Sequence, residues 1–226
     1  MLDILYEDNH FIIVNKPSGI LVQQDKQKHE ENLESAVKAY IKEKFNKPGE
    51  VFVGIPHRID RPTSGVVITC RTSKALERVN EMFQRKEIKK TYWAIVKNVP
   101  PKEADTLIHY LRKDEKQNRT FAYEKEVPGS QRAEMHYEII AQSDRYCLLQ
   151  IQIITGRHHQ IRAQLSQLKC PIRGDLKYGY DRSNPGGGID LHARSVAFIH
   201  PVTKLPLFIE APIRKDVLWE AITKDL

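Results

Sequence analysis

Short apolar runs bounded by turn residues predict a chain made largely of β-strands. Residues 11–14 are apolar, residues 15–19 carry an Asn-Lys-Pro-Ser-Gly turn signal, and apolar residues resume at 20–22. The continuous apolar run at 66–68 is typical of a buried strand. Further strands are predicted at 51–53, 91–96, 133–140, 147–154, 194–200 and 205–210.

Apolar positions three or four residues apart predict helices at 32–45, 74–87 and 158–168, and a last short helix that begins at Pro212. Strands and helices do not alternate regularly along the chain. This mixture predicts the α+β class, with one domain over residues 1–226 built on a mixed, mostly antiparallel sheet flanked by helices.

Residues 102–131 are the most polar part of the chain. They include charged runs at 112–116 and 124–126. We expect a solvated insertion there, in the form of a mobile hairpin, and not a separate domain.

The charge balance changes the picture. Lys and Arg number 36 against 29 Asp and Glu, which gives a formal net charge of +7. A positive excess suggests a polyanionic partner, with nucleic acid as the first candidate, although many basic proteins bind none. No apolar run approaches the ~18 residues of a membrane helix, and the first residues lack the pattern of a signal peptide.

Three cysteines, Cys70, Cys147 and Cys170, lie far apart in or beside apolar runs. Their odd number and their apolar surroundings predict buried free thiols instead of disulfide bridges. Free thiols fit a reducing compartment, so we expect a cytoplasmic protein.

The stretch 57–65, His-Arg-Ile-Asp-Arg-Pro-Thr-Ser-Gly, concentrates candidate chemistry just before the strand at 66–68. Asp60 lies between Arg58 and Arg61 on a loop that leads into a rigid element, where functional residues are common. An ionised carboxylate partly stripped of water can act as a nucleophile, a general base or a metal ligand. Taken alone, such an aspartate is more often part of a structural ion pair or a turn.

Other stretches give this loop a context. Residues 90–94 read Lys-Thr-Tyr-Trp-Ala, residues 155–162 read Thr-Gly-Arg-His-His-Gln-Ile-Arg, and residues 171–175 read Pro-Ile-Arg-Gly-Asp. Together with 57–65 and the opening stretch 6–19, these motifs closely resemble those of the RluA-type family of RNA pseudouridine synthases. The resemblance covers nearly the whole chain in the same order.

The resemblance implies an enzyme that isomerises selected uridines of structured RNA, rRNA or tRNA, to pseudouridine after the target base is flipped out. It implies no cofactor and no metal. It also implies that Asp60 is the essential carboxylate, that Tyr92 packs on the target base, and that Arg162 pairs with Asp60. Arg58 is implied to reach into the RNA near the flipped nucleotide.

The resemblance also bears on organisation. Many family members carry an RNA-binding domain before the first strand, and this chain begins at that strand, so we expect a member without one. Ile59 replaces the usual leucine, and His158 stands where a smaller residue is common, which concerns local packing only. We expect an RNA stem-loop as the partner, no membrane association, and a monomer, since no exposed apolar stripe is obvious.

The residue chemistry leaves the first reaction step open. A hydrolytic glycosidase usually needs two carboxylates, and only Asp60 stands out here. A uracil leaving group can carry its own negative charge, so a second acid is less necessary. Asp60 could attack C1′ of the ribose, attack C6 of the base, or remove the C2′ proton. Tyr92 or Asp60 could then accept the proton from C5.

Each assignment has a structural alternative. Arg162 could be a surface helix residue, Tyr92 an ordinary strand aromatic, and Arg58 a simple phosphate contact or ion-pair partner. For the chain as a whole, one alternative is an RNA-binding module of the same fold that has lost catalysis. Another is a metal-dependent nuclease or nucleotide hydrolase.

A metal site would have to use His57, His158 and His159. Adjacent residues on a helix point about 100° apart, so His158 and His159 cannot easily chelate one ion. The chain also lacks the HExxH spacing and a cysteine cluster. The sequence therefore disfavours a metal centre.

Overall fold

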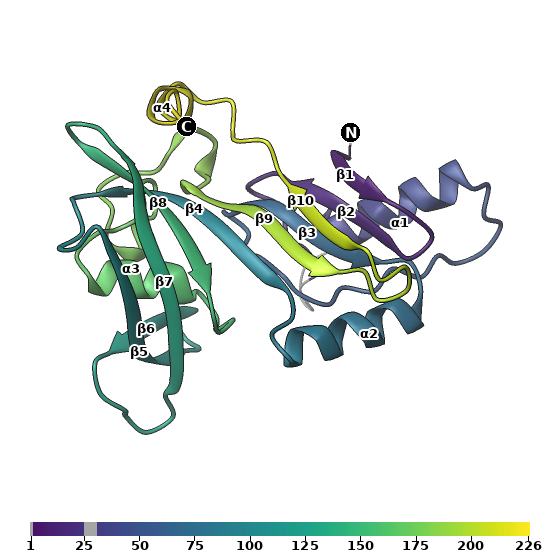
Figure 1. Ribbon diagram of the computed structural model, residues 1–226, viewed down its shortest axis with the longest axis horizontal. Coiled ribbons are helices and arrows are strands. Elements are labelled where there is room, and N and C mark those ends of the chain that lie inside the picture. The colour runs from purple at the N-terminus through teal and green to yellow at the C-terminus, as the bar shows by residue number, and fades with distance from the viewer. Residues whose placement is uncertain (1, 25–30) are drawn as a thin grey trace. The chain divides into compact units, whose positions relative to one another are not determined.

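The computed structural model describes residues 2–24 and 31–226. The chain forms two compact units, whose helices and strands are labelled in Figure 1. The first unit consists of Met1–Lys90 and Ala193–Pro212, and the second consists of Thr91–His192 and Ile213–Leu226. Two strands run from one unit into the other: β4 (Lys89–Lys97) and β9 (Leu191–Ile199).

The first unit holds β1 (Ile4–Glu7), β2 (Phe11–Lys16), β3 (Ser64–Cys70), β10 (Pro206–Glu210) and most of β9. The strand order is β1-β2-β3-β9 with β10 paired to β9, and the β1–β2, β2–β3 and β9–β10 pairings are antiparallel. Every residue of β3 is buried, which confirms the strand predicted at 66–68. The strands predicted at 20–22 and 51–53 are wrong, since Leu21 forms only an isolated bridge and 51–53 form no strand.

Two helices of the first unit, α1 (Leu33–Lys44) and α2 (Ser73–Gln84), confirm the helices predicted from periodicity. Each begins at a residue whose side chain accepts a hydrogen bond from the first turn, Asn32 for α1 and Thr72 for α2. Such caps satisfy backbone N–H groups that have no partner inside the helix.

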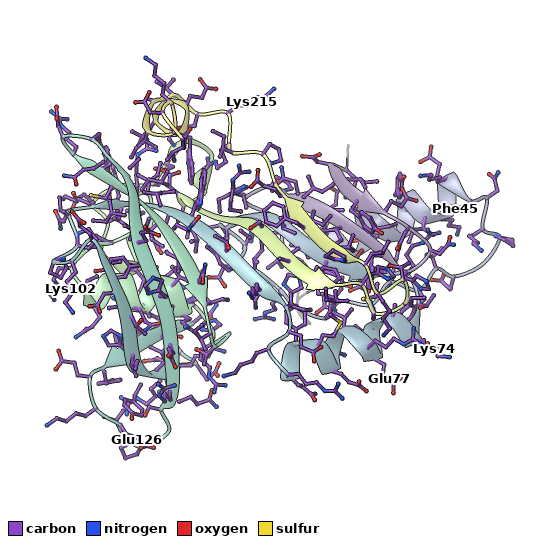
Figure 2. The ribbon with its side chains drawn as sticks, viewed as in Figure 1. Phe45, Lys74, Glu77, Lys102, Glu126 and Lys215 are labelled. Carbon is purple, nitrogen blue, oxygen red and sulfur yellow. The ribbon has the colours of Figure 1, made fainter. Side chains whose placement is uncertain are left out.

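Helix α2 packs on one face of the strands of the first unit (Figure 1). The other side of the helix is polar, and Lys74 and Glu77 point away from the strands into solvent (Figure 2). The core between helix and strands consists of buried aliphatic and aromatic residues, chiefly Ala75, Val79 and Met82 against Phe11, Ile13, Val66, Ile68, Val196, Phe198 and Ile209. This core holds β3, and therefore the end of the 57–63 loop, in a fixed position.

The second unit holds the remainder of β4 together with β5 (Ala104–Asp114), β6 (Arg119–Tyr123), β7 (Gln131–Gln142) and β8 (Tyr146–Ile153). Their order is β4-β8-β7-β5-β6, and every neighbouring pair is antiparallel. The strands predicted at 91–96, 133–140 and 147–154 are therefore confirmed.

The polar segment 102–131 differs from the expectation of a solvated insertion. It does form a hairpin, β5–β6, but β5 also pairs with β7 from Ala104 to Leu111. Leu107 and Leu111 are buried, so the segment is an integral part of the sheet of this unit. The burial alternates at Leu107, His109 and Leu111, and the charged residues on either side of this stretch obscure the pattern.

Helix α3 (Gln160–Gln167) confirms the helix predicted at 158–168, although it begins two residues later. The last helix, α4 (Val217–Ile222), begins after Asp216, whose side chain accepts from the backbone N–H of Leu218, and not at Pro212. Its fully buried residue is Trp219, which packs with Ile222 against Ile95 and Leu148.

The architecture confirms the α+β class with mostly antiparallel strands. The boundaries of a single catalytic domain over residues 1–226 stay a prediction. The three cysteines are free and buried, as predicted. In the part of the chain that the structure describes, no helix is both long and apolar enough to span a membrane.

Candidate functional site

The loop that carries Asp60 belongs to the first unit and ends at β3. Asp60 is half-buried, the preceding Ile59 is buried, and Arg58 is exposed. The backbone N–H of Thr63 donates to the Asp60 carbonyl oxygen at 3.0 Å, which closes a turn directly after the carboxylate. The backbone thus fixes Asp60 and leaves its side chain partly accessible.

A buried lysine, Lys16, is hydrogen-bonded to the backbone of this loop. The side chain of Lys16 at the end of β2 is 0% exposed, and its Nζ donates to the carbonyl oxygens of Pro17 and Ile20, each at 2.9 Å, and of Arg61 at 3.2 Å. Burial lowers the pKa of Lys16 to about 7, while the charge of Asp60 acts in the opposite direction. An ammonium so placed joins the 17–20 turn to the loop and attracts the Asp60 carboxylate.

The same two segments are joined a second time through Arg61 and Gly19. The backbone N–H of Gly19 donates to the Arg61 carbonyl at 2.8 Å, and Nε of Arg61 donates to the Gly19 carbonyl at 2.8 Å. Sequence analysis treated the Asn-Lys-Pro-Ser-Gly stretch only as a turn and missed the role of Lys16. The available signal was a lysine that ends a strand of otherwise mostly apolar residues.

His57 at the start of the loop holds the loop to β3 within the first unit. Its Nε2 accepts a hydrogen bond from the backbone N–H of Ile68 at 2.9 Å. Burial, with a smaller effect of the positive charge of Lys90, lowers the pKa of His57 to about 3. The ring is therefore neutral, with its proton on Nδ1.

Gly65 ends the motif for a steric reason. Its φ is +112°, and a Cβ there would lie 2.6 Å from the backbone nitrogen of Ala193 and closer still to its carbonyl oxygen. Only glycine allows the backbones of β3 and β9 to approach this closely.

Arg162 of α3 lies in the second unit and is 5% exposed, so it is not the surface helix residue of the structural alternative. Its Nε and Nη2 donate to the two carboxylate oxygens of Asp175 at 2.7 and 2.9 Å. The guanidinium also lies 4.8 Å from the centroid of the Tyr178 ring. A bidentate ion pair of this kind fixes both the position and the orientation of the guanidinium.

Tyr178 connects this pair to the histidines that precede α3. Its hydroxyl accepts from the backbone N–H of Thr120 at 2.8 Å and lies 2.8 Å from Nδ1 of His159. Burial, followed by the positive charge of Arg162, lowers the pKa of His159 to about 2, so the ring is neutral and shares a hydrogen bond with the hydroxyl. His158 stacks on His159 at 3.8 Å between centroids, and its Nδ1 contacts the Thr120 hydroxyl at 2.8 Å.

The remainder of the 155–162 motif shapes the turn that starts α3. Oε1 of Gln160 accepts from the hydroxyl of Thr155 at 2.8 Å and from the backbone N–H of Arg157 at 3.0 Å. Nε2 of the same side chain donates to the carbonyl of Glu134 at 3.0 Å. The motif therefore anchors α3 to the sheet and so places Arg162.

Sequence analysis missed the hub around Asp190. This residue is 0% exposed, and its carboxylate accepts from Arg173 at 2.6 Å and from Arg214 at 3.1 Å. Asn184 and Trp219 donate to the same carboxylate at 3.0 and 3.2 Å. The hub holds the 171–175 segment, and hence the partner of Arg162, in place. No local sequence signal marks such a residue, because its partners come from distant segments.

Tyr92 lies on β4 in the second unit, opposite Ile151 of β8, and is 7% exposed. Asp60 and Arg58 belong to the first unit, and Tyr92 and Arg162 to the second. The pairing of Asp60 with Arg162 and the stacking role of Tyr92 stay predictions. Within the described ranges, no group of three or more His, Cys, Asp and Glu residues is arranged to hold a metal ion.

Known proteins resemble this chain over most of its length. The family model for RNA pseudouridylate synthase matches residues 10–167. The tRNA pseudouridine synthase C of Vibrio cholerae serotype O1 is 32% identical over 243 residues, which cover 100% of this chain and 96% of that protein. The protein of the same name from Pectobacterium carotovorum subsp. carotovorum is 31% identical over 240 residues, 98% of this chain and 61% of that protein.

The chain is also similar to a ribosomal large subunit pseudouridine synthase and to a solved structure. The ribosomal large subunit pseudouridine synthase C of Vibrio cholerae is 32% identical over 227 residues, 98% of this chain and 68% of that protein. The structure of human RNA pseudouridylate synthase domain containing 4 covers 94% of this chain and 89% of its own, with a TM-score of 0.78 and 23% identity. This structural likeness confirms the expected fold.

Proposed function

The chain belongs to the RluA-type RNA pseudouridylate synthases, and from this premise we propose that it isomerises selected uridines of rRNA or tRNA, with Asp60 as the essential carboxylate. The observation that carries the proposal is the span of the family match, because residues 10–167 include Asp60, Tyr92 and Arg162. We further propose that the protein acts as a cytoplasmic monomer on an RNA stem-loop and uses no cofactor.

The reaction needs no redox partner. The bond from C1′ to N1 breaks, a bond from C1′ to C5 forms, C5 loses its proton and N1 gains one. Asp60 starts this sequence by attack at C1′, attack at C6 or removal of the C2′ proton. Its half-buried position on a loop held by Lys16 suits all three, because a fixed and partly dehydrated carboxylate is reactive.

We propose that Tyr92 and Arg162 complete the site. The buried ring of Tyr92 would stack on the extruded uracil, which is worth about 1–3 kcal/mol and offsets much of the unstacking free energy. Arg162, held in one orientation by Asp175, would place its remaining charge and N–H groups against Asp60. The exposed Arg58 would reach into the RNA beside the flipped nucleotide.

The proposal is tested with unmodified tRNA and rRNA transcripts that carry tritium at C5 of uridine. The wild-type protein should release tritium without strand scission in the presence of a chelator. Asp60→Asn keeps the shape of the side chain and should reduce release by at least about 10⁴-fold, if the carboxylate acts in the chemical step. The matched control is Asp144→Asn, at an exposed aspartate between β7 and β8, which should behave like the wild type.

Other results would favour the alternatives. Binding without tritium release would support an RNA-binding module that lacks catalysis. Strand scission that requires a divalent ion would support a nuclease. For the individual roles, Tyr92→Ala and Arg162→Met should each lose activity steeply. Arg58→Ala should slow single-turnover chemistry more than it weakens RNA binding.

A further inference from the structure

Lys90 carries a partly buried ammonium group that has no anionic partner within residues 2–24 and 31–226. Its Nζ lies 5.0 Å from the centroid of the Phe83 ring. Burial lowers the pKa of Lys90 to about 8. A cation taken out of water is unfavourable unless a partner restores the lost interaction, and an aromatic ring restores only a small part of it.

A second donor lies beside the same ring. The centroid of His57 is 5.2 Å from that of Phe83, so His57 and Lys90 both border this aromatic side chain. Because Nε2 of His57 accepts from the backbone of Ile68, the N–H group of this ring is at Nδ1. The described part of the chain supplies no carboxylate as a partner for either donor.

The two donors also border the proposed reaction centre along the chain. His57 precedes Asp60 by three residues in the same loop, and Lys90 precedes Tyr92 by two residues in the same strand. This placement along the chain suggests that a group bound by the two donors would belong to the RNA close to the nucleotide on which Asp60 acts.

On these grounds we propose that Lys90 and Nδ1–H of His57 bind a phosphate group of the RNA backbone next to the target uridine. One cationic donor and one neutral donor border the Phe83 ring, and neither is paired with a carboxylate of the described residues, which suits a phosphate oxyanion. Phosphate contacts fix the register of a nucleic acid, and a flipped nucleotide needs such a fixed point. The inference rests on the proposed function, since it takes RNA as the source of the phosphate.

The variant Lys90→Met tests the site, because methionine keeps the aliphatic stem against Phe83 and removes the charge. RNA affinity at low salt should fall about tenfold, and the slope of log Kd against log salt should decrease by about one. Lys90→Arg should retain affinity within about threefold, since it keeps a cation. The matched control is Lys89→Met, which removes an exposed charge at the adjacent position and should change affinity less than about twofold.

A stability measurement separates this role from a structural one. Loss of an unpaired, partly buried charge should leave the Tm of Lys90→Met equal to or above that of the wild type. A lower Tm together with unchanged RNA affinity would mean that Lys90 only supports the fold, and would overturn the proposal. An equal loss of affinity in Lys89→Met would overturn it too, because the effect would then be one of general charge.

The tritium assay distinguishes failure of the proposed function from failure of the phosphate site alone. If wild-type protein releases no tritium from any transcript, the proposed function fails. If it releases tritium and Lys90→Met binds RNA with the wild-type salt slope, only the phosphate site fails.

Inorganic phosphate at constant ionic strength should compete with RNA weakly, and it should compete more strongly for the wild type than for Lys90→Met. Strong saturation by phosphate in the absence of RNA would assign the site to the free ion instead.

Discussion

At the scale of single residues, the Arg162–Asp175 pair should dominate the local energetics. Both side chains are almost fully buried, at 5% and 2% exposure. Asp175→Asn leaves the guanidinium without its counter-charge, so we expect the free energy of unfolding to fall by about 3–5 kcal/mol. Urea denaturation followed by circular dichroism measures this loss.

An exposed ion pair provides the comparison. Glu134 accepts from Arg132 at 2.7 Å on the surface of β7, and both side chains are accessible. Glu134→Gln should lower the free energy of unfolding by less than about 1 kcal/mol. Equal losses in the two variants would show that burial does not strengthen the Arg162–Asp175 pair.

A second residue-scale prediction concerns acid. The pKa of His159 is lowered to about 2 in the folded protein, whereas an unfolded histidine titrates near pH 6.5. Between these values the unfolded state binds the additional proton, so stability is complete above about pH 6.5 and decreases as the pH falls below it. At pH 5 the decrease from this residue is at most about 2 kcal/mol.

The variant His159→Gln tests the acid prediction, because glutamine does not titrate. Urea midpoints at about pH 7.5 and pH 5 should differ less for the variant than for the wild type. The variant is compared with itself at the two pH values, so a constant loss of packing cancels. An unchanged difference between the midpoints would mean that His159 is already protonated in the folded protein at pH 5.

The sequence motifs identified candidate site residues, but they did not identify the residues that contact them in the folded protein. Asp60, Tyr92 and Arg162 could be selected because a family pattern surrounds each of them. Asp190 could not, since its partners come from segments far away in the chain, and the link from Lys16 to the distant Arg61 carbonyl was equally hidden. A buried charge is visible in a sequence only when its surroundings are also known.

At the scale of elements, the turn into β3 depends on Gly65. Gly65→Ala places a methyl group against the Ala193 backbone at a φ of +112°. We expect a loss of at least about 2 kcal/mol in the free energy of unfolding, because strain and overlap add together. Thermal denaturation followed by circular dichroism measures this loss.

The control for this prediction is Gly49→Ala, at a glycine where an added Cβ meets nothing within 4 Å. That change should alter stability by less than about 1 kcal/mol. If Gly65→Ala were as stable as this control, the close approach of β3 and β9 would not require glycine.

Periodicity predicted elements well where one face is buried and the other is polar. Helices α1 and α2 show this pattern, whereas the capping role of Asn32 before α1 was not predicted. The prediction failed for β5, because charged residues outnumber the alternating buried ones, Leu107, His109 and Leu111. It also failed at 20–22, where apolar residues follow a turn without finding a partner strand.

At the scale of the whole molecule, the net charge of +7 predicts RNA binding that is dominated by phosphate contacts. The wild-type Kd for tRNA and rRNA transcripts should rise steeply with salt, with several phosphates' worth of slope on a log–log plot. Filter binding over about 50–300 mM potassium chloride measures this slope. A flat response would mean that apolar or base contacts dominate the docking of RNA.

The fold class could be predicted from the sequence because strand and helix patterns determine how layers combine. The division into two compact units could not, since it depends on which strands exchange contacts over long distances. The same limit applies to the proposed site, whose residues are distributed between both units.

The sealed position of Lys16 gives this protein a natural reporter. Acylating reagents react with an unprotonated, accessible amine, and Nζ of Lys16 is enclosed by three carbonyl groups. Its modification therefore requires the hydrogen bonds that join residues 17–20 to residues 60–63 to break. The labelling rate of this one amine, measured by mass spectrometry, reports the frequency of local unfolding around Asp60 in the native protein.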